Sequence, residues 1–425
     1  MFNMLSQFQK QVKNKKKRRK WWLFNATDFQ SLMYPCFISC RILGIFPYKI
    51  HDFIFEASRS RYISSTIVIC ITCIHTLAIF YKTNVLNINI EVARKIQDNC
   101  FFTLELFIII VWYILNGPRM CLLQTILNIS TKLSPKMYEK LSKLIHIKDI
   151  FGFLFFTARM FMSSRNYYQI LIKNDYIELL CELEFYISLQ VFQMNMLYIN
   201  CVCILKACFQ KVNDQLTNLG ELMVNDNLCI PRLINHEQRN PFLLDKLRSL
   251  KKQHMIVSDT VQMLNTIFSP QLLASIIIVF IEITFELYFN MVQWQNGLSI
   301  SLTIYQFDIH NTFIISYIVY NIIMLILIVW ACETSKNQAM KLSTTVHDVI
   351  NSTSDIQIKD ELQLFSLQIL HRDNIISAKV LIVDARLITA MVGIITTYLL
   401  ILIQFLIIMH SCDRNNANNV THAIR

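Results

Sequence analysis

The sequence predicts an all-α membrane protein of seven transmembrane helices, with the N-terminus in the cytoplasm and the C-terminus outside the cell. Three observations predict this class. Hydrophobic residues make up 54% of the 425-residue chain and charged residues only 16%, whereas soluble domains carry about 25% charged residues. Several apolar runs approach the roughly 20 residues that cross a hydrocarbon core as a helix. Lysine and arginine are also concentrated in alternate connecting segments.

The candidate spans are seven apolar runs, at 62–81, 100–116, 150–164, 185–205, 267–289, 312–332 and 387–409. The third run contains Arg159, and the fourth is preceded by Glu182 and Glu184. An ionisable side chain at membrane depth is costly, so it faces other helices or a water-filled cavity rather than lipid. We therefore expect Arg159 to point into the bundle.

The distribution of positive charge predicts the orientation. Lysine and arginine remain on the cytoplasmic side of membrane proteins. With the N-terminus inside, the inner segments carry 32 of the 40 lysines and arginines, and the outer segments carry 7. Residues 1–61 are then a cytoplasmic basic N-terminus followed by an interfacial or re-entrant segment around Gly44 and Pro47. The basic run at 13–20 is attributed to anionic membrane lipids and not to nucleic acid.

The inner segments predict helical extensions in the cytoplasm. Residues 62–332 form a six-helix transmembrane bundle with such extensions, including a helical hairpin around Pro135 and a continuation of the fourth span to Val224. Residues 333–386 are predicted to be cytoplasmic anchor helices. One of them follows the sixth span, and another leads from Asp360 into the last span.

The last helix, at 387–411, carries a polar stripe and precedes a short extracellular tail at 412–425. At 100° per residue, one face about 100° wide holds its small and polar residues, which are Thr389, Gly393, Thr396, Thr397 and Gln404. Tyr398 and Phe405 lie on the opposite face. A helix that faces only lipid needs no such stripe, so it packs against another helix or lines water.

Motifs of catalysis and cofactor binding are absent from the sequence. The 10 histidines and 29 acidic residues show no ligand or catalytic spacing, and the 13 cysteines form no extracellular framework. We therefore expect no enzyme activity, no cofactor and no metal site.

A pocket for a small molecule is expected among the outer halves of the second, fifth and sixth spans. Such pockets combine aromatic walls with a few polar groups, and the candidate residues are Glu105, Glu286, Phe285, Tyr288, Phe289, Tyr317 and Tyr320. The aromatic residues of the fifth span can equally serve packing or an interfacial aromatic belt.

A C-terminal segment at about 365–412 resembles the signature of the insect gustatory receptor family, and the predicted topology and length agree over the whole chain. The resemblance lies in the blocks at 365–371 and 384–387, and above all in Thr397-Tyr398, five apolar residues and Gln404-Phe405. It implies a cell-membrane receptor of sensory neuron dendrites, in which four subunits form a non-selective cation channel opened by a small-molecule tastant. The pore would be lined by Gly393, Thr396, Thr397, Leu400, Gln404 and Ile407. Tyr398 and Phe405 would pack against the bundle, and Leu400, Ile403 and Ile407 could form an apolar constriction.

Other classes of membrane protein fit less well. A G-protein-coupled receptor requires an outside N-terminus, against the charge distribution. A secondary transporter would favour helices broken by glycine and proline, but the chain has only 6 glycines. The insect odorant receptors share the topology and stay the main alternative. The ligand, and whether the tetramer contains one kind of subunit or several, stay open.

Overall fold

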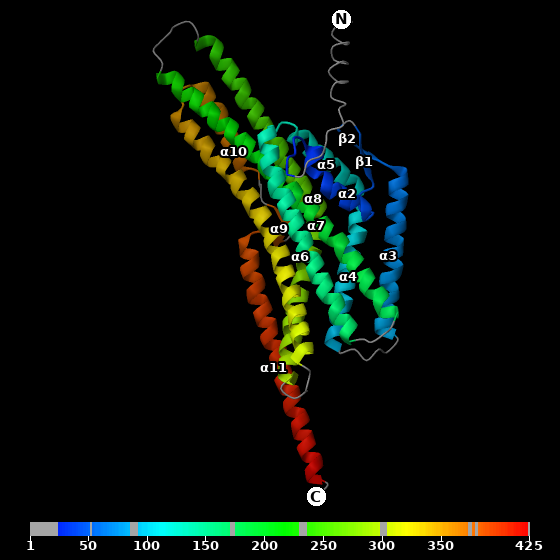
Figure 1. The fold of residues 1–425 in the computed structure, drawn as a ribbon. Coiled ribbons are helices and arrows are strands. Elements are labelled where there is room, and N and C mark those ends of the chain that lie inside the picture. The colour runs from blue at the N-terminus through cyan, green and yellow to red at the C-terminus, as the bar shows by residue number, and fades with distance from the viewer. Residues whose placement is uncertain are drawn as a thin grey trace.

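The fold is a bundle of long helices (Figure 1). The computed structural model describes residues 24–51, 53–85, 92–170, 175–228, 236–297, 304–372, 376–378 and 381–423. Each predicted span falls in one long helix, except that the second, at 100–116, extends two residues beyond the end of α4. These helices are α3 (Arg59–Val85), α4 (Val92–Ile114), α6 (Pro135–Ile170), α7 (Asp175–Leu228), α8 (His236–Gly297), α9 (Ile304–Ser352) and α11 (Ala385–Ala423). The predicted helical architecture is therefore confirmed.

Among the described residues, six of these helices are long and apolar enough to cross a membrane. The exception is α6, whose apolar stretch is interrupted by Arg159. The direction in which the chain crosses the membrane stays a prediction from the charge distribution.

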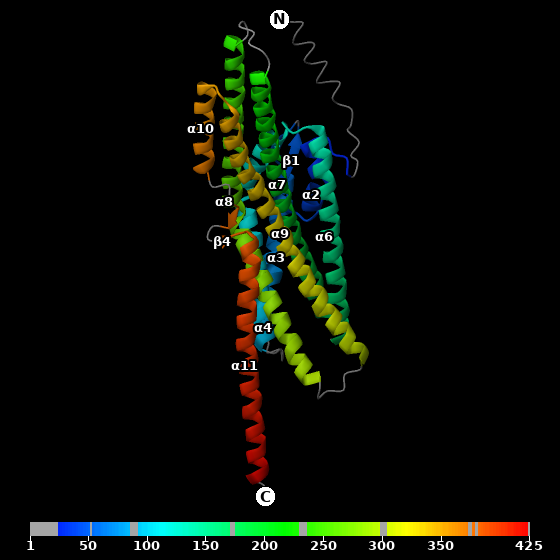
Figure 2. The same ribbon diagram turned by 90° about the vertical axis from the view of Figure 1, so that its left-hand side faces the viewer.

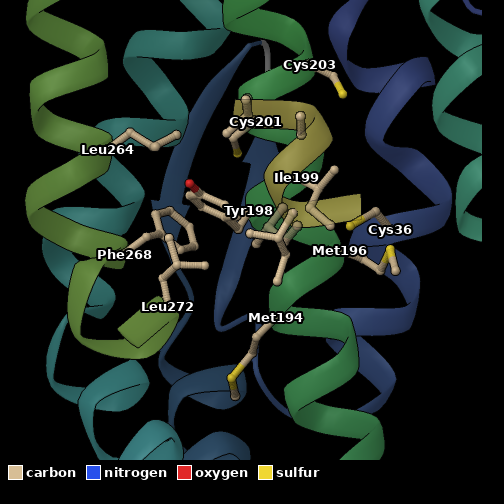
Figure 3. Packing of buried hydrophobic residues seen from close by; sticks show 14 of the residues in the cluster. Cys36, Met194, Met196, Tyr198, Ile199, Cys201, Cys203, Leu264, Phe268 and Leu272 are labelled. Carbon is tan, nitrogen blue, oxygen red and sulfur yellow. The ribbon is translucent and has the colours of Figure 1, made fainter. Parts of the chain in front are cut away.

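Helix α7 forms the centre of the main core. Every residue from 190 to 205 is buried, as expected for a helix that is apolar on all sides. Figure 3 shows its side chains, including Met194, Tyr198 and Cys201, lying between Cys36 and the side chains of α8, such as Phe268. This packing holds the membrane-spanning helices around one central element.

Residues 29–57 precede the first span and fold against the core. Helix α2 (Phe29–Ile42) begins at a capping box formed by Asp28 and Ser31, and is too short to span a membrane. Strands β1 (Tyr48–His51) and β2 (Ile54–Ala57) form an antiparallel hairpin. The sequence predicts an interfacial or re-entrant segment here. The structure adds that α2 buries Leu32, Met33 and Cys40 completely.

A second core joins the helical extensions at one end of the bundle (Figure 1). It contains Leu216 of α7, Leu247 of α8 and Leu342 of α9, together with Phe365 of α10 (Ile356–Leu370). The turn expected near Pro135 lies between α5 (Asn116–Ser130) and α6. The continuous extensions of α7, α8 and α9 agree with the helical periodicity of the sequence.

One expectation for this region was wrong. The helix expected to run from Asp360 into the last span ends at Leu370, and strands β3 (Ser377–Ala378) and β4 (Leu381–Ile382) pair before α11 begins. Burial of two apolar side chains explains this difference. Because β3 and β4 are antiparallel, Val383 N lies close to Ile376 O and donates a hydrogen bond to it at 3.3 Å. Both side chains are 2% exposed, so the hairpin adds two apolar residues to the main core.

Candidate functional site

A small polar cavity lies inside the bundle between α4, α6, α7, α8 and α9. Its volume is about 50 Å³. Its polar lining includes Glu105, Arg159, Glu282, Tyr317 and Tyr320, and the remaining walls are largely apolar. A concave apolar site with a few converging polar groups is the usual form of a small-molecule pocket.

Arg159 of α6 is the buried cation of this cavity. Its guanidinium carbon lies 4.1 Å from the ring centroid of Tyr317 and 5.0 Å from that of Tyr320. The side chain is 4% exposed, and its Nε has no hydrogen-bond partner in the described part of the chain. Cation–π contacts are strongest where water is excluded. The expectation that Arg159 faces the bundle interior is therefore met, and it leaves one buried N–H donor free.

Acidic side chains surround this cation. Ser188 donates a hydrogen bond to Glu105 Oε1 at 3.3 Å, while Glu105 Oε2 has no hydrogen-bond partner among the described residues. The Tyr317 hydroxyl donates to Glu282 Oε2. Buried polar atoms without partners are costly, and the cavity lining holds one such acceptor, Glu105 Oε2, and one such donor, Arg159 Nε, within the described part of the chain.

A hydrogen-bonded network extends from the cavity toward the C-terminal end of α8. Gln97 of α4 donates to Glu282 Oε2 and to Glu286 Oε1, both at 3.2 Å. Arg94 pairs with Glu286 at 2.9 Å, and its guanidinium carbon lies 4.2 Å from the Phe289 ring centroid. This network ties α4 to α8 beside the cavity.

The structure brings some of the predicted pocket residues together and separates others. Glu105, Tyr317 and Tyr320 line the cavity. Glu286 and Phe289 lie in the adjoining network, and Phe285 and Tyr288 contact the Phe289 ring from partly exposed positions.

Arg159 and Glu282 also line the cavity, although the sequence analysis did not include them among the candidate pocket residues. Arg159 is recognisable as an ionisable residue within a span. Glu282 lies four residues before Glu286 in the fifth span and therefore on the same helical face. Both signals were present in the sequence.

Helix α11 packs on its own bundle through one apolar edge. Leu387, Met391 and Ile395 recur every four residues and are buried. The Tyr398 ring lies 6.0 Å from the Phe280 ring of α8, edge to face. Figure 2 shows that α11 continues well past the ends of the neighbouring helices.

The predicted pore-lining residues lie on the other side of α11. Gly393, Thr396, Thr397, Leu400 and Gln404 are all exposed. The two threonine hydroxyls donate to backbone carbonyls of the preceding turn, and a Cβ added at Gly393 would meet no atom of the described structure within 4 Å. The Ile407 side chain lies outside the described residues. Tyr398 and Phe405 are 53% and 64% exposed, and the packing role of Phe405 stays a prediction.

The block around Phe365 fastens α10 to α8. Phe365 is fully buried, and its ring centroid lies 5.5 Å from that of His254. Gln368 Nε2 donates to Lys251 O at 3.0 Å and to His254 Nδ1 at 3.1 Å. This block therefore has a structural role in the second core.

An ion-paired carboxylate reinforces the same contact. Glu361 of α10 accepts from Arg248 Nε at 3.0 Å and from Lys251 Nζ at 3.2 Å. Partial burial alone would raise the pKa of Glu361, but the two cationic donors outweigh it and hold the pKa below its usual value. The ionised form of Glu361 therefore stabilises the second core.

Comparison with protein families gives a match over most of the chain. Residues 33–409 match the model of a family described as 7tm chemosensory receptor. The match includes the polar cavity, the second core and the described side chains of α11.

Two curated relatives match at the level of sequence. They are the candidate gustatory receptors 28a and 28b of Drosophila melanogaster, with 28% identity over 180 residues and 27% over 209 residues. The matches cover 42% and 46% of this chain. The chain spans less than half the length of these relatives, at 40% and 44%.

Solved structures share the fold. The insect olfactory receptor OR5 from Machilis hrabei, solved alone and in complex with eugenol, superposes with a TM-score of 0.64 in both structures. The alignment covers 88% of this chain and 98% of the receptor, at 12% and 11% sequence identity. At this identity the likeness concerns the fold.

Proposed function

Because the chain belongs to the 7tm chemosensory receptor family, we propose that it is a gustatory-type receptor acting as a tetrameric, ligand-gated, non-selective cation channel. The chain is a multi-pass protein of the cell membrane. The gustatory assignment is supported by the complete block from Thr397 to Phe405 and by the two Drosophila relatives.

The observation that carries the channel proposal is the two-sided character of α11. Its apolar edge is buried on the bundle, and its small and polar stripe is exposed on the other side. Four copies arranged around an axis would turn this stripe toward a central water path. Leu400, Ile403 and Ile407 would then narrow the path as an apolar ring that closes by excluding water.

The ligand proposed for the cavity is a small tastant with hydrogen-bonding groups. The OR5 structure in complex with eugenol gives a precedent for a small molecule on this fold. Arg159 would offer its free N–H, and Glu105 its free carboxylate oxygen. A volume of about 50 Å³ corresponds to a few water molecules, so the ligand would stabilise a wider arrangement of the helices. Opening then follows by population shift.

An odorant-type channel is the second candidate. The superposition on the OR5 structures supports an odorant-type channel as much as a gustatory-type channel, because the two receptor types share this fold. The two differ in their ligands and in the subunits they need. A chain that responds to volatile compounds only with a partner subunit would favour the odorant type.

Expression of this chain alone in oocytes, with current recording over a panel of sugars, bitter compounds and volatiles, tests the proposal. The expected result is a ligand-evoked, non-selective cation current. Gln404→Ala should change ion selectivity or gating. Ile394→Ala, at an exposed position outside the stripe, should not. A wild-type current in the Gln404 variant would argue against pore lining.

A further inference from the structure

A second hollow lies at the other end of the bundle, toward the second core and apart from the polar cavity. It is an open groove of about 350 Å³ between α5, α7 and α8, and is much larger than the polar cavity. Its lining comes from the end of α5, the turn after it, one turn of α7 near Lys211 and one turn of α8 near Ile256. These segments belong to regions predicted to be cytoplasmic or near the inner membrane surface.

Two lysines border this groove. Lys132 lies in the turn between α5 and α6 and is exposed, whereas Lys211 on α7 is half-buried. Their charges are close enough to repel each other. Among the ion pairs of the described residues, carboxylates pair with Lys143, Lys148, Lys251 and Lys336, but not with either groove lysine. Two neighbouring ammonium groups without a carboxylate attract an anion.

The rest of the groove is mainly apolar. Its walls include the side chains of Ile129, Leu133, Val212, Ile256 and Val257. Leu133, Val212 and Val257 are also part of the buried cores. Asn128 and Gln253 add neutral polar groups. A free inorganic anion would gain nothing from such walls, whereas a hydrocarbon chain gains from every CH₂ that leaves water.

The part of the groove that carries Lys132 is held in place by hydrogen bonds. Lys132 N donates to Ile129 O, and Leu133 N donates to Ser130 O at 2.9 Å. The Tyr138 hydroxyl of α6 donates to the same Ser130 carbonyl at 2.6 Å. The turn therefore presents Lys132 from a fixed backbone, which lowers the entropy cost of binding.

We propose that this groove binds an anionic phospholipid. The headgroup phosphate lies between Lys132 and Lys211, and an acyl chain covers the apolar wall formed with Ile256 and Val257. Charge complementarity selects the anionic headgroup, and the apolar walls select a lipid over a soluble phosphate. The proposal is independent of the tastant, because the groove and the polar cavity have no residue in common.

The test is lipid binding to the purified full-length chain in detergent. Native mass spectrometry would titrate phosphatidylserine against phosphatidylcholine with the same acyl chains. The wild type should bind phosphatidylserine more tightly. A lysine near the membrane surface contributes about fivefold to the affinity for anionic lipid. Lys132→Ala with Lys211→Ala should therefore weaken phosphatidylserine binding roughly 30-fold and leave phosphatidylcholine unchanged.

Two matched variants isolate the role of these lysines. Lys136→Ala with Lys140→Ala removes the same charge from exposed positions on α6 outside the groove, and should bind lipid as the wild type does. Lys132→Arg with Lys211→Arg should retain binding. Unchanged phosphatidylserine affinity in the double alanine variant would overturn the proposal.

Soluble competitors distinguish a lipid from a free anion. Inorganic phosphate and glycerophosphoserine should fail to displace phosphatidylserine at matched concentration. Equal displacement would overturn the lipid assignment in favour of a soluble anion. Loss of subunit assembly in the double alanine variant, with lipid binding intact, would instead identify the groove as a contact between proteins and also overturn it.

Discussion

Replacing Gly220 by alanine tests how tightly the second core is packed. A Cβ built at Gly220 of α7 would lie 2.7 Å from Val349 Cγ2 of α9, whereas ordinary van der Waals contacts lie at 3.4–4 Å. Val349 is 5% exposed, and a β-branched side chain in a helix is held to one main rotamer. The methyl group cannot swing aside, so α7 and α9 must move apart.

The magnitude follows from two opposing effects. Overpacking a core costs about 1–3 kcal/mol, whereas glycine to alanine in a helix gains about 1 kcal/mol. If overpacking at Val349 costs about 2 kcal/mol and the better helix propensity of alanine returns about 1 kcal/mol, Gly220→Ala alone should lower the free energy of unfolding by about 1 kcal/mol. Val349→Ala removes the clashing methyl groups. In that background the same glycine substitution should stabilise the protein by about 1 kcal/mol.

The assay is the thermal unfolding midpoint of the four detergent-purified proteins of this double-mutant cycle. Gly220→Ala should lower the midpoint of the wild type and raise that of the Val349→Ala variant. Gly117→Ala is the matched control, because a Cβ at Gly117 would meet no atom within 4 Å among the residues that the structure describes. The reasoning is refuted if the Gly220 substitution shifts the midpoint in the same direction in both backgrounds.

Three further predictions concern the second core and α11. Glu361→Gln should cost about 1 kcal/mol of stability at pH 7. Because the pKa of Glu361 is lowered in the fold, the difference from wild type should shrink as the pH falls below about 4.3, which denaturation at several pH values would measure. Gln368→Leu leaves the Lys251 carbonyl and a His254 ring nitrogen without their donor and should cost about 1–3 kcal/mol, read from denaturant midpoints. Gly393→Ala should not reduce surface expression, because its Cβ would meet no atom of the described residues within 4 Å, but should change single-channel conductance; unchanged conductance would argue against a pore-lining position.

Local sequence patterns predicted the helices well but not the contacts between distant segments. Apolar runs and helical periodicity are local signals, and they identified each long helix and the extension of α7 beyond Lys206. The hairpin that ends with Ile382 depends on burial against distant helices. The contact of Arg159 with Tyr317 joins residues that are 158 positions apart in the sequence. Charge and depth indicated that Arg159 faces the interior, but its aromatic partner depends on how α6 packs against α9.

Helix α8 is the element through which the polar cavity and the last helix can be coupled. Val279 and Glu282 line the cavity, and Phe280, on another face of the same helix, contacts Tyr398 of α11. A ligand that widens the cavity must displace at least one of its walls. If α8 moves as a rigid helix, the displacement reaches Tyr398, on the opposite side of α11 from the polar stripe. This edge-to-face contact is therefore the place where a movement of α8 would be transmitted to α11.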